Sequence, residues 1–169
     1  NGLEPIVLPP AAKGFAKGES IVTNAIPHVG KTLVVNVDIQ SFFPSTSYEQ
    51  IHGACIYLAN GNLSGAAGRL LASICSFDGG LPMGAPTSPA IANLVLRKVD
   101  YSLSTAAARY GISYTRYADD LTFSGADKPQ RILPFLARIL AELGYELDPK
   151  KTNLFRKGRR QVVTGLVVN

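Results

Sequence analysis

Residues 112–124 read ISYTRYADDLTFS, and this stretch decides the fold. Two short runs with high strand propensity, Ile112–Arg116 and Leu121–Ser124, flank the tetrapeptide Tyr117-Ala118-Asp119-Asp120. This spacing predicts a β-hairpin with two adjacent carboxylates at its tip. Adjacent aspartates repel each other, so a folded chain tolerates the pair best where a cation or solvent compensates the charge.

A third carboxylate, Asp38, ends the apolar, β-branched run Leu33–Val37, which predicts a central strand. Three carboxylates at strand ends are what a pair of Mg²⁺ ions needs for phosphoryl transfer, with the ions about 3.5–4 Å apart. Taken singly, each has a simpler interpretation. Asp38 would cap the helix that follows it, and Asp119-Asp120 is a common turn dipeptide.

Composition limits the class of protein. The 169 residues are 46% apolar and 17% charged, which is typical of a globular chain. No apolar run approaches the roughly 20 residues of a membrane span. The N-terminus lacks Met and a signal-peptide pattern, so we expect a fragment of a longer protein. Cys55 and Cys75 have no metal-site spacing and indicate buried thiols in a reducing compartment.

Positive charge is concentrated near the C-terminus. The net charge is +5, and residues 150–160 contain six basic residues and no acid. In an arbitrary protein such a run indicates a solvated hairpin face. Beside a carboxylate cluster of the metal-binding type, contact with a phosphate backbone is the better interpretation.

The remaining patterns predict an α+β fold. We expect an irregular Pro- and Gly-rich segment over residues 1–32 and a turn at Asn60-Gly61-Asn62. The order β, α, α, β-hairpin, α, β indicates a ferredoxin-like antiparallel sheet with helices packed on one face. The expected helices are Tyr48–Ala59, Ala66–Ile74, Pro89–Tyr110 with Ser88 as N-cap, and one after Asp127 through Ile132–Leu143; the further strands are Tyr145–Leu147 and Gln161–Val168.

Leu81–Pro89 is a rigid turn that opens a helix, and Gly84 within it lets a nucleotide or template base pass close to the backbone. With this segment the set of motifs resembles the palm of reverse transcriptases, over about residues 13–169. The matching segments, in order, are Val35–Phe43, Leu81–Pro89, Tyr117–Asp120, Pro149–Thr152 and Val163–Gly165. Asn24-Ala25-Ile26-Pro27-His28 and Val163-Thr164-Gly165 resemble the NAxxH and VTG segments of the bacterial retron-type group.

The resemblance implies an RNA-directed DNA polymerase. Asp38 and Asp119 would ligate two Mg²⁺ ions, which Mn²⁺ can replace, and Asp120 would complete the metal and catalytic site. A primer 3′-hydroxyl would attack the α-phosphate of a deoxynucleotide on an RNA template. Lys151 would protonate the pyrophosphate; a phosphate-facing surface lysine is an equal alternative.

The resemblance also implies the residues that hold substrates. Phe43 matches the aromatic gate that excludes the ribose 2′-hydroxyl, although one of Phe42 and Phe43 is expected in the core. Met83 stands where the family usually has Gln, which alters how the nucleotide is held. The implied nucleotide contacts are Ile39, Phe43, Met83 and Gly84, and the implied nucleic-acid contacts are Pro86, Ser88, Lys150, Arg156, Thr164 and Gly165.

Residues 1–32 would then be a remnant of the fingers and residues 33–169 the palm, with the thumb absent. His28 is interpreted as a structural, hydrogen-bonding histidine. Gln161–Gly165 would form the primer grip. The chain could by itself be a catalytically incomplete nucleic-acid-binding palm. A nucleotidyl cyclase shares the palm plan, but has no use for the Leu81–Pro89 turn.

The implied partners are an RNA template, a DNA primer and deoxynucleotides, with a structured non-coding RNA and an effector protein as further candidates. No membrane contact is expected, and the implied location is the bacterial cytoplasm. The sequence leaves open a retron, a group II intron, a CRISPR-linked system or an antiviral defence system. The two subgroup segments favour a retron.

Overall fold

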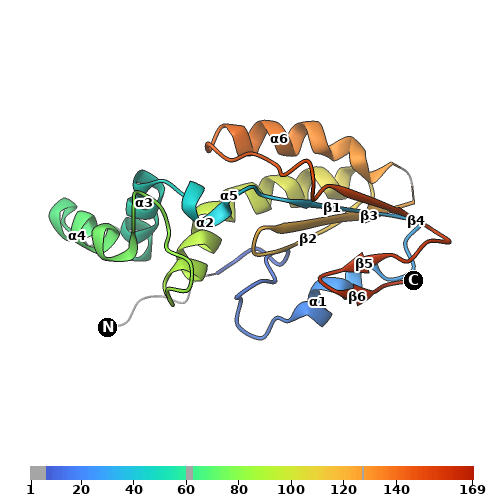
Figure 1. Cartoon of the computed structure of the whole chain (residues 1–169), viewed down its shortest axis with the longest axis horizontal. Coiled ribbons are helices and arrows are strands. Elements are labelled where there is room, and N and C mark those ends of the chain that lie inside the picture. Colours follow the sequence, from blue (N-terminus) through green and yellow to red (C-terminus); the bar gives the residue numbers. More distant parts are fainter. Residues whose placement is uncertain (1–6, 60–62, 127) are drawn as a thin grey trace. The chain divides into compact units, whose positions relative to one another are not determined.

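The computed structural model describes residues 7–59, 63–126 and 128–169, and the chain forms two compact units. Unit 1 comprises residues 7–8 and 41–97, and unit 2 comprises residues 9–40 and 98–169. Helix α5 (Ser88–Arg109) runs through both (Figure 1). Its first part is therefore described with unit 1 and its second part with unit 2.

Unit 2 is built on a four-stranded antiparallel sheet in the order β2-β3-β1-β4. The strands are β1 (Leu33–Asp38), β2 (Ser113–Tyr117), β3 (Asp120–Gly125) and β4 (Asn153–Arg156). β2 and β3 form the predicted hairpin, and β1 pairs with β3 along its whole length. Successive side chains of a strand point to opposite faces, so this register fixes which side chains share a face.

Helices cover one face of the sheet. Tyr114 and Phe123 are cross-strand neighbours whose rings stack at 4.8 Å, and the Tyr114 hydroxyl donates to Asp100 of α5. Val35, opposite Phe123, is buried on the same face. The other elements on this side are η2 (Pro129–Ile132) and α6 (Leu133–Ala141), as Figure 1 shows. This confirms the predicted α+β fold, with helices packed on an antiparallel sheet.

The opposite face is covered at one end by a second, partial layer. Its elements are α1 (Ile21–Ala25), η1 (Ile26–His28), β5 (Val162–Val163) and β6 (Leu166–Val167). Val34 of β1 packs there in an apolar cluster with Ala25, Val163 and Val168. Figure 1 shows α1 and the β5–β6 hairpin on the side of the sheet away from α6. Asp38, the last residue of β1, lies on the remaining part of this face.

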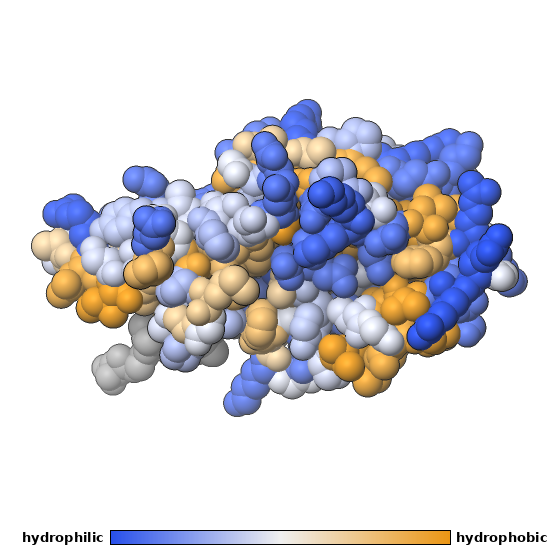
Figure 2. Space-filling view, in the orientation of Figure 1, coloured by the Kyte–Doolittle hydropathy of each residue, from blue (hydrophilic) through white to orange (hydrophobic). Residues whose placement is uncertain are grey.

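Unit 1 is helical. It contains α2 (Phe42–Ser45), α3 (Tyr48–Leu58), α4 (Gly65–Cys75) and the first part of α5. Ser47 and Gln50 form a capping box that starts α3, which satisfies backbone donors at that end. The Tyr48 hydroxyl donates to the Arg69 carbonyl and links α3 to α4. Figure 2 shows hydrophobic residues on the surface of α4, where Leu70 and Ile74 are exposed.

The predicted helices are confirmed, with α3, α4 and α5 each within two residues of the expected bounds. The helix predicted through Ile132–Leu143 is present as η2 followed by α6. The N-terminal segment, predicted to be irregular, contains the short helices α1 and η1. The turn at 60–62 and the cap at Asp127 lie outside the described residues.

Two strand predictions were wrong. Tyr145–Leu147 forms no strand, because only Leu147 bridges to the sheet, opposite Ile39. Gln161–Val168 is not one strand but the β5–β6 hairpin, because Thr164 and Gly165 have φ of 44° and 85° and reverse the chain. The edge strand β4 was not predicted. In the described part of the chain no helix is long and apolar enough to cross a membrane.

Candidate active site

The structure brings the three predicted carboxylates together at one end of the sheet. Asp38 is the last residue of β1 and lies directly opposite Asp120, the first residue of β3. Asp119 occupies the turn before β3, and its carbonyl accepts a hydrogen bond from the Ile39 N–H at 3.0 Å. By strand alternation the side chains of Asp38 and Asp120 share the face of Val34, away from the helices.

The turn that carries Asp119 is held in a strained conformation. Ala118 has φ of 58°, a left-handed value that residues with a Cβ rarely adopt. Gly14 lies against this turn, and a Cβ at Gly14 would overlap the backbone nitrogen of Ala118. The Arg116 carbonyl also accepts hydrogen bonds from Lys13 N–H at 2.8 Å and Gly14 N–H at 3.3 Å. The N-terminal segment therefore braces the turn from one side.

A buried ion pair braces the turn from the helical side. Arg116 is fully buried and donates to both carboxylate oxygens of Asp100 on α5, from Nε at 2.8 Å and Nη2 at 2.7 Å. Its Nη1 donates to the Ala118 carbonyl at 3.0 Å. The Tyr114 hydroxyl donates to the same carboxylate at 2.8 Å, so the pair is well hydrogen-bonded. Sequence reasoning missed this network; a charged residue inside an alternating strand was the only signal.

The electrostatics of the site match a cluster of like charges. Burial, reinforced by Asp38 and Asp119, raises the pKa of Asp120 to about 6. Burial also raises the pKa of Asp119, with a further contribution from Asp38. The Lys151 ammonium donates to Asp38 Oδ1 at 2.8 Å, and this hydrogen bond raises the pKa of Lys151. Lys151 therefore supplies part of the positive charge that the aspartates need.

The donor set suits a hard divalent cation, since carboxylate oxygens are the ligands that Mg²⁺ prefers. The pKa values of Asp119 and Asp120 are raised, and a nearby cation would lower them again because it favours the charged carboxylates. As they stand, no three His, Cys, Asp or Glu side chains within residues 7–59, 63–126 and 128–169 are arranged to hold an ion. Asp38 is instead paired with Lys151.

The predicted nucleotide residues divide between the two units. Ile39 belongs to unit 2; the residue is fully buried, and its N–H donates to the Asp119 carbonyl. Phe43 belongs to unit 1; it is half-buried, and its carbonyl accepts from Leu81 N–H at 3.0 Å. Phe42 is the member of the pair in the core. Met83 is 82% exposed, the most exposed large hydrophobic side chain of the described residues.

The predicted template-supporting turn lies in unit 1. Gly84 has φ of 84°, which favours glycine, and open space where a Cβ would be. Pro86 is exposed. The Ser88 hydroxyl is buried and donates to the Pro82 carbonyl at 2.7 Å. Ser88 therefore shapes the turn through its side chain and starts α5 at the same point.

The predicted nucleic-acid residues of unit 2 lie on exposed segments. Lys150 and Arg156 are exposed, before β4 and at its end. Thr164 and Gly165 form the tip of the β5–β6 hairpin. The Asn24 side chain donates to Thr164 Oγ1 at 3.3 Å, across 140 residues of sequence. The two segments that marked the subgroup in the sequence are therefore parts of one folded layer.

His28 anchors this layer to the sheet. It is fully buried, with Nδ1 at 2.6 Å from Ser124 Oγ and Nε2 at 2.8 Å from Thr115 Oγ1. Burial, with a smaller contribution from Lys31, lowers its pKa to about 4, so the ring is neutral at pH 7. The structural interpretation of this histidine is confirmed.

Comparison with known proteins matches residues 3–165 to the family described as reverse transcriptase (RNA-dependent DNA polymerase). Retron Mx65 reverse transcriptase of Myxococcus xanthus is 41% identical over 95% of this chain and 42% of its own. Retron Ec86 reverse transcriptase of Escherichia coli is 37% identical over 100% of this chain and 52% of its own. The chain thus spans about half the length of such relatives.

Solved structures share the fold at low sequence identity. The apo telomerase of Candida tropicalis has a TM-score of 0.68 and 9% identity, over 94% of this chain and 36% of that one. The telomerase of Candida albicans, in complex with a fragment of telomeric RNA, has a TM-score of 0.67 and 10% identity, over 94% and 34%. These likenesses establish the polymerase palm as the architecture of the chain.

Proposed function

The chain belongs to the reverse transcriptase family, in its bacterial retron-type branch, and we propose that it is the catalytic palm of an RNA-directed DNA polymerase. The observation that carries this proposal is the pairing of Asp38 with Asp120 beside Asp119 in a braced turn. Residues 33–169 would form the palm, and residues 1–32 would belong to the fingers.

In this proposal Asp38 and Asp119 bind two Mg²⁺ ions, and Asp120 completes the site. Bound ions would lower the pKa of the primer 3′-hydroxyl and neutralise the leaving phosphates. Asp38 now pairs with Lys151, so its carboxylate must exchange this ammonium group for a metal ion. Lys151 is 58% exposed along its side chain, so once released from Asp38 it would have room to move toward the phosphates of the product. That movement suits a proton donor to pyrophosphate.

Substrate contacts follow from the same assignment. Phe43 would exclude the ribose 2′-hydroxyl, and Met83 and the open backbone at Gly84 would line the nucleotide. The long, polarizable side chain of Met83 packs against many shapes but gives up the amide hydrogen bonds of Gln. The proposed primer and template contacts are Pro86, Lys150, Arg156, Thr164 and Gly165; the buried Ser88 would act through the shape of the turn.

The proposed partners are an RNA template and a DNA primer. The basic segment 150–160 supports contact with a phosphate backbone, because it holds six cations and no acid. A structured non-coding RNA as template source, an effector protein and a cytoplasmic location are further parts of the proposal. They rest on the retron-type relatives alone.

Deoxynucleotide incorporation on an RNA template with an annealed DNA primer tests the proposal. We expect Mg²⁺- or Mn²⁺-dependent extension by the longer parent protein, and its loss in Asp119→Asn. Primer extension by the 169-residue chain would show in addition that this chain is sufficient for polymerisation. Nucleotide turnover without a primer would favour a cyclase. If the parent protein bound primer–template without extending the primer, the alternative of a catalytically incomplete nucleic-acid-binding palm would be favoured.

A further inference from the structure

A groove runs between α5 and the η2–α6 segment of unit 2. Its volume is about 580 Å³, within the range of ligand-binding pockets. Aromatic and basic side chains dominate its lining: Tyr101, Arg109, Tyr110, Arg131 and Phe135. Tyr110 is 67% exposed and Tyr101 is 44% exposed, so both rings are accessible at the surface.

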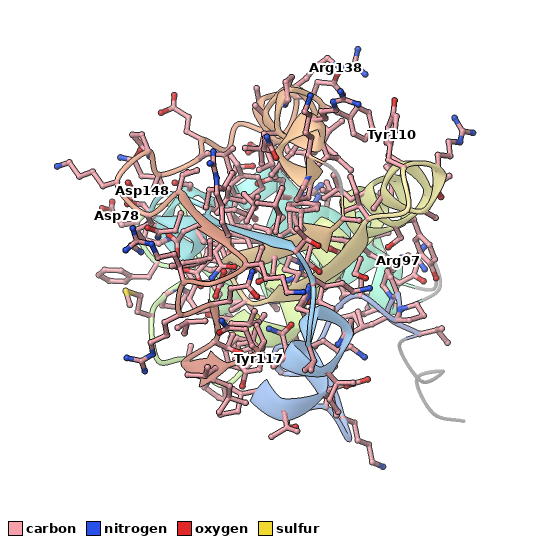
Figure 3. The ribbon with its side chains drawn as sticks, turned by 90° about the vertical axis from the view of Figure 1, so that its right-hand side faces the viewer. Asp78, Arg97, Tyr110, Tyr117, Arg138 and Asp148 are labelled. Atoms are coloured by element: carbon pink, nitrogen blue, oxygen red, sulfur yellow. The ribbon has the colours of Figure 1, made fainter. Side chains whose placement is uncertain are left out.

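The groove lies on the other face of the sheet from the three aspartates. The helices α5 and α6 cover the face of Tyr114 and Phe123, whereas Asp38 and Asp120 share the opposite face. Figure 3 agrees, because it shows Tyr117 on the far side of the sheet from Tyr110 and Arg138. A ligand in the groove would therefore leave the catalytic face accessible.

Among the described residues that line the groove, the charged side chains are all basic. Arg109 and Arg131 line it, and the Arg138 guanidinium lies 5.5 Å from the centre of the Phe135 ring at its side. Within residues 7–59, 63–126 and 128–169, no Asp or Glu lines the groove. The one acid nearby on α5, Asp100, is fully buried and paired with Arg116. The groove therefore favours an anionic ligand with flat, apolar groups.

We propose that this groove is a second nucleic-acid site, which binds an unpaired segment of RNA or DNA. Bases would stack on Tyr101 and Tyr110, and phosphates would contact Arg109 and Arg131, because single strands bind through aromatic platforms and cations together. From Tyr101 to Arg109 the helix rises about 12 Å. Stacked nucleotides of one strand are about 3.4 Å apart, so the groove is long enough for a few of them.

The choice of nucleic acid as the ligand rests on the proposed function. A polymerase that copies a folded template has use for a second site that holds template or product away from the reacting end. The same groove chemistry would suit a peptide rich in acidic and aromatic residues. Nucleic acid is favoured because the proposed catalytic face of the same unit handles the same ligand class.

Binding of a short fluorescein-labelled oligouridylate and its oligothymidylate counterpart, followed by anisotropy across a salt series, tests the site. We expect Arg109→Gln with Arg131→Gln to reduce the slope of log affinity against log salt by about 1.4, from two phosphate contacts. Tyr110→Ala should weaken binding at least about five-fold. The matched control, Lys17→Gln with Arg69→Gln, should reduce the slope by less, since neither residue lines the groove.

Cross-linking identifies the face that is occupied. An oligomer that contains 4-thiouridine should label peptides with Tyr101 and Tyr110, and the stronger of the two oligomers identifies RNA or DNA as the ligand. Labels confined to residues 117–120 and 150–165, with unchanged affinity in the groove variants, would overturn the proposal. The proposal would also be overturned if binding of an acidic, aromatic peptide depended on Arg109 while binding of neither oligomer depended on it.

Discussion

Substitution of Asp100 by Ala tests the ion pair beneath the turn that carries Asp119. Asp100 accepts two hydrogen bonds from the buried Arg116 and one from Tyr114. Without the carboxylate, a guanidinium group and a phenol are left buried without that partner. Breaking a buried pair in this way costs about 3–5 kcal/mol, which is a large share of the roughly 5–15 kcal/mol by which a domain is stable.

A paired replacement separates stability from positioning. Asp100→Leu combined with Arg116→Met removes both charges and fills similar volume, so we expect a smaller loss of stability than in Asp100→Ala, with the Tyr114 hydroxyl still lacking its acceptor. The Ala118 carbonyl still loses its hydrogen bond from Arg116 Nη1. We therefore expect the double variant to fold with a looser Asp119 turn, and to extend primers more slowly than the parent protein.

Urea unfolding followed by circular dichroism measures the effect, since the chain has no Trp for fluorescence. Asp100→Ala should lower the free energy of unfolding by about 3–5 kcal/mol and the melting temperature by about 6–20 °C. Asp100→Asn keeps the shape of the side chain, so the loss of stability in this variant measures the contribution of the carboxylate charge. A loss below about 1 kcal/mol, as for an exposed pair, would refute the reasoning.

Three further predictions concern the same site. The folded-state pKa of Asp120, about 6, exceeds its ordinary 3.8, so the folded chain holds an extra proton between these values and loses stability as pH rises through them. Asp120→Asn should reduce this loss, to which the raised pKa of Asp119 also contributes, and should stabilise the metal-free chain at pH 7 by about 1–2 kcal/mol. Equal urea midpoints of the unchanged chain across that pH range would contradict it. Gly14→Ala should destabilise the chain by about 1–3 kcal/mol in thermal melts, because its methyl group meets the Ala118 backbone, whereas Gly18→Ala adds a methyl group in open space at a strained φ and controls for backbone strain. Phe43→Val in the parent protein should admit ribonucleotides in competition assays, and unchanged sugar discrimination would remove the gate assignment.

The arrangement of the three aspartates at one end of the sheet could be predicted from the sequence, because local strand and turn preferences agree there. Alternating strand formers around Tyr117–Asp120 allow one hairpin register, and Asp38 ends a run of buried residues. The helices of unit 1 were equally predictable, since Ser47 and Ser64 are N-caps before helical stretches.

Tertiary contacts decided the features that the sequence did not reveal. Arg116 is fully buried although its charge predicts exposure, because Asp100 of a distant helix pairs with it. β4 has exposed side chains and no alternation, and it is a strand because the edge of β1 is available for pairing. Gly14 acts through a close approach to Ala118 that no local pattern encodes.

The subgroup segments are a related case. Asn24 and Thr164 are 140 residues apart, and nothing in either segment indicates that their side chains meet. His28 has its partners on β2 and β3, where Thr115 and Ser124 alternate with core residues. Motif recognition found both segments, but their joint role in one layer came from the fold.

Titration of the chain with Mn²⁺, followed by electron paramagnetic resonance of the free ion, tests the central claim most directly. The claim is that Asp38, Asp119 and Asp120 form one divalent-metal site. We predict bound Mn²⁺ that Mg²⁺ displaces, with binding strongly reduced in Asp119→Asn and unaffected in the control Asp78→Asn, which changes a carboxylate outside the proposed site. Equal Mn²⁺ binding by the Asp119→Asn variant would contradict the claim.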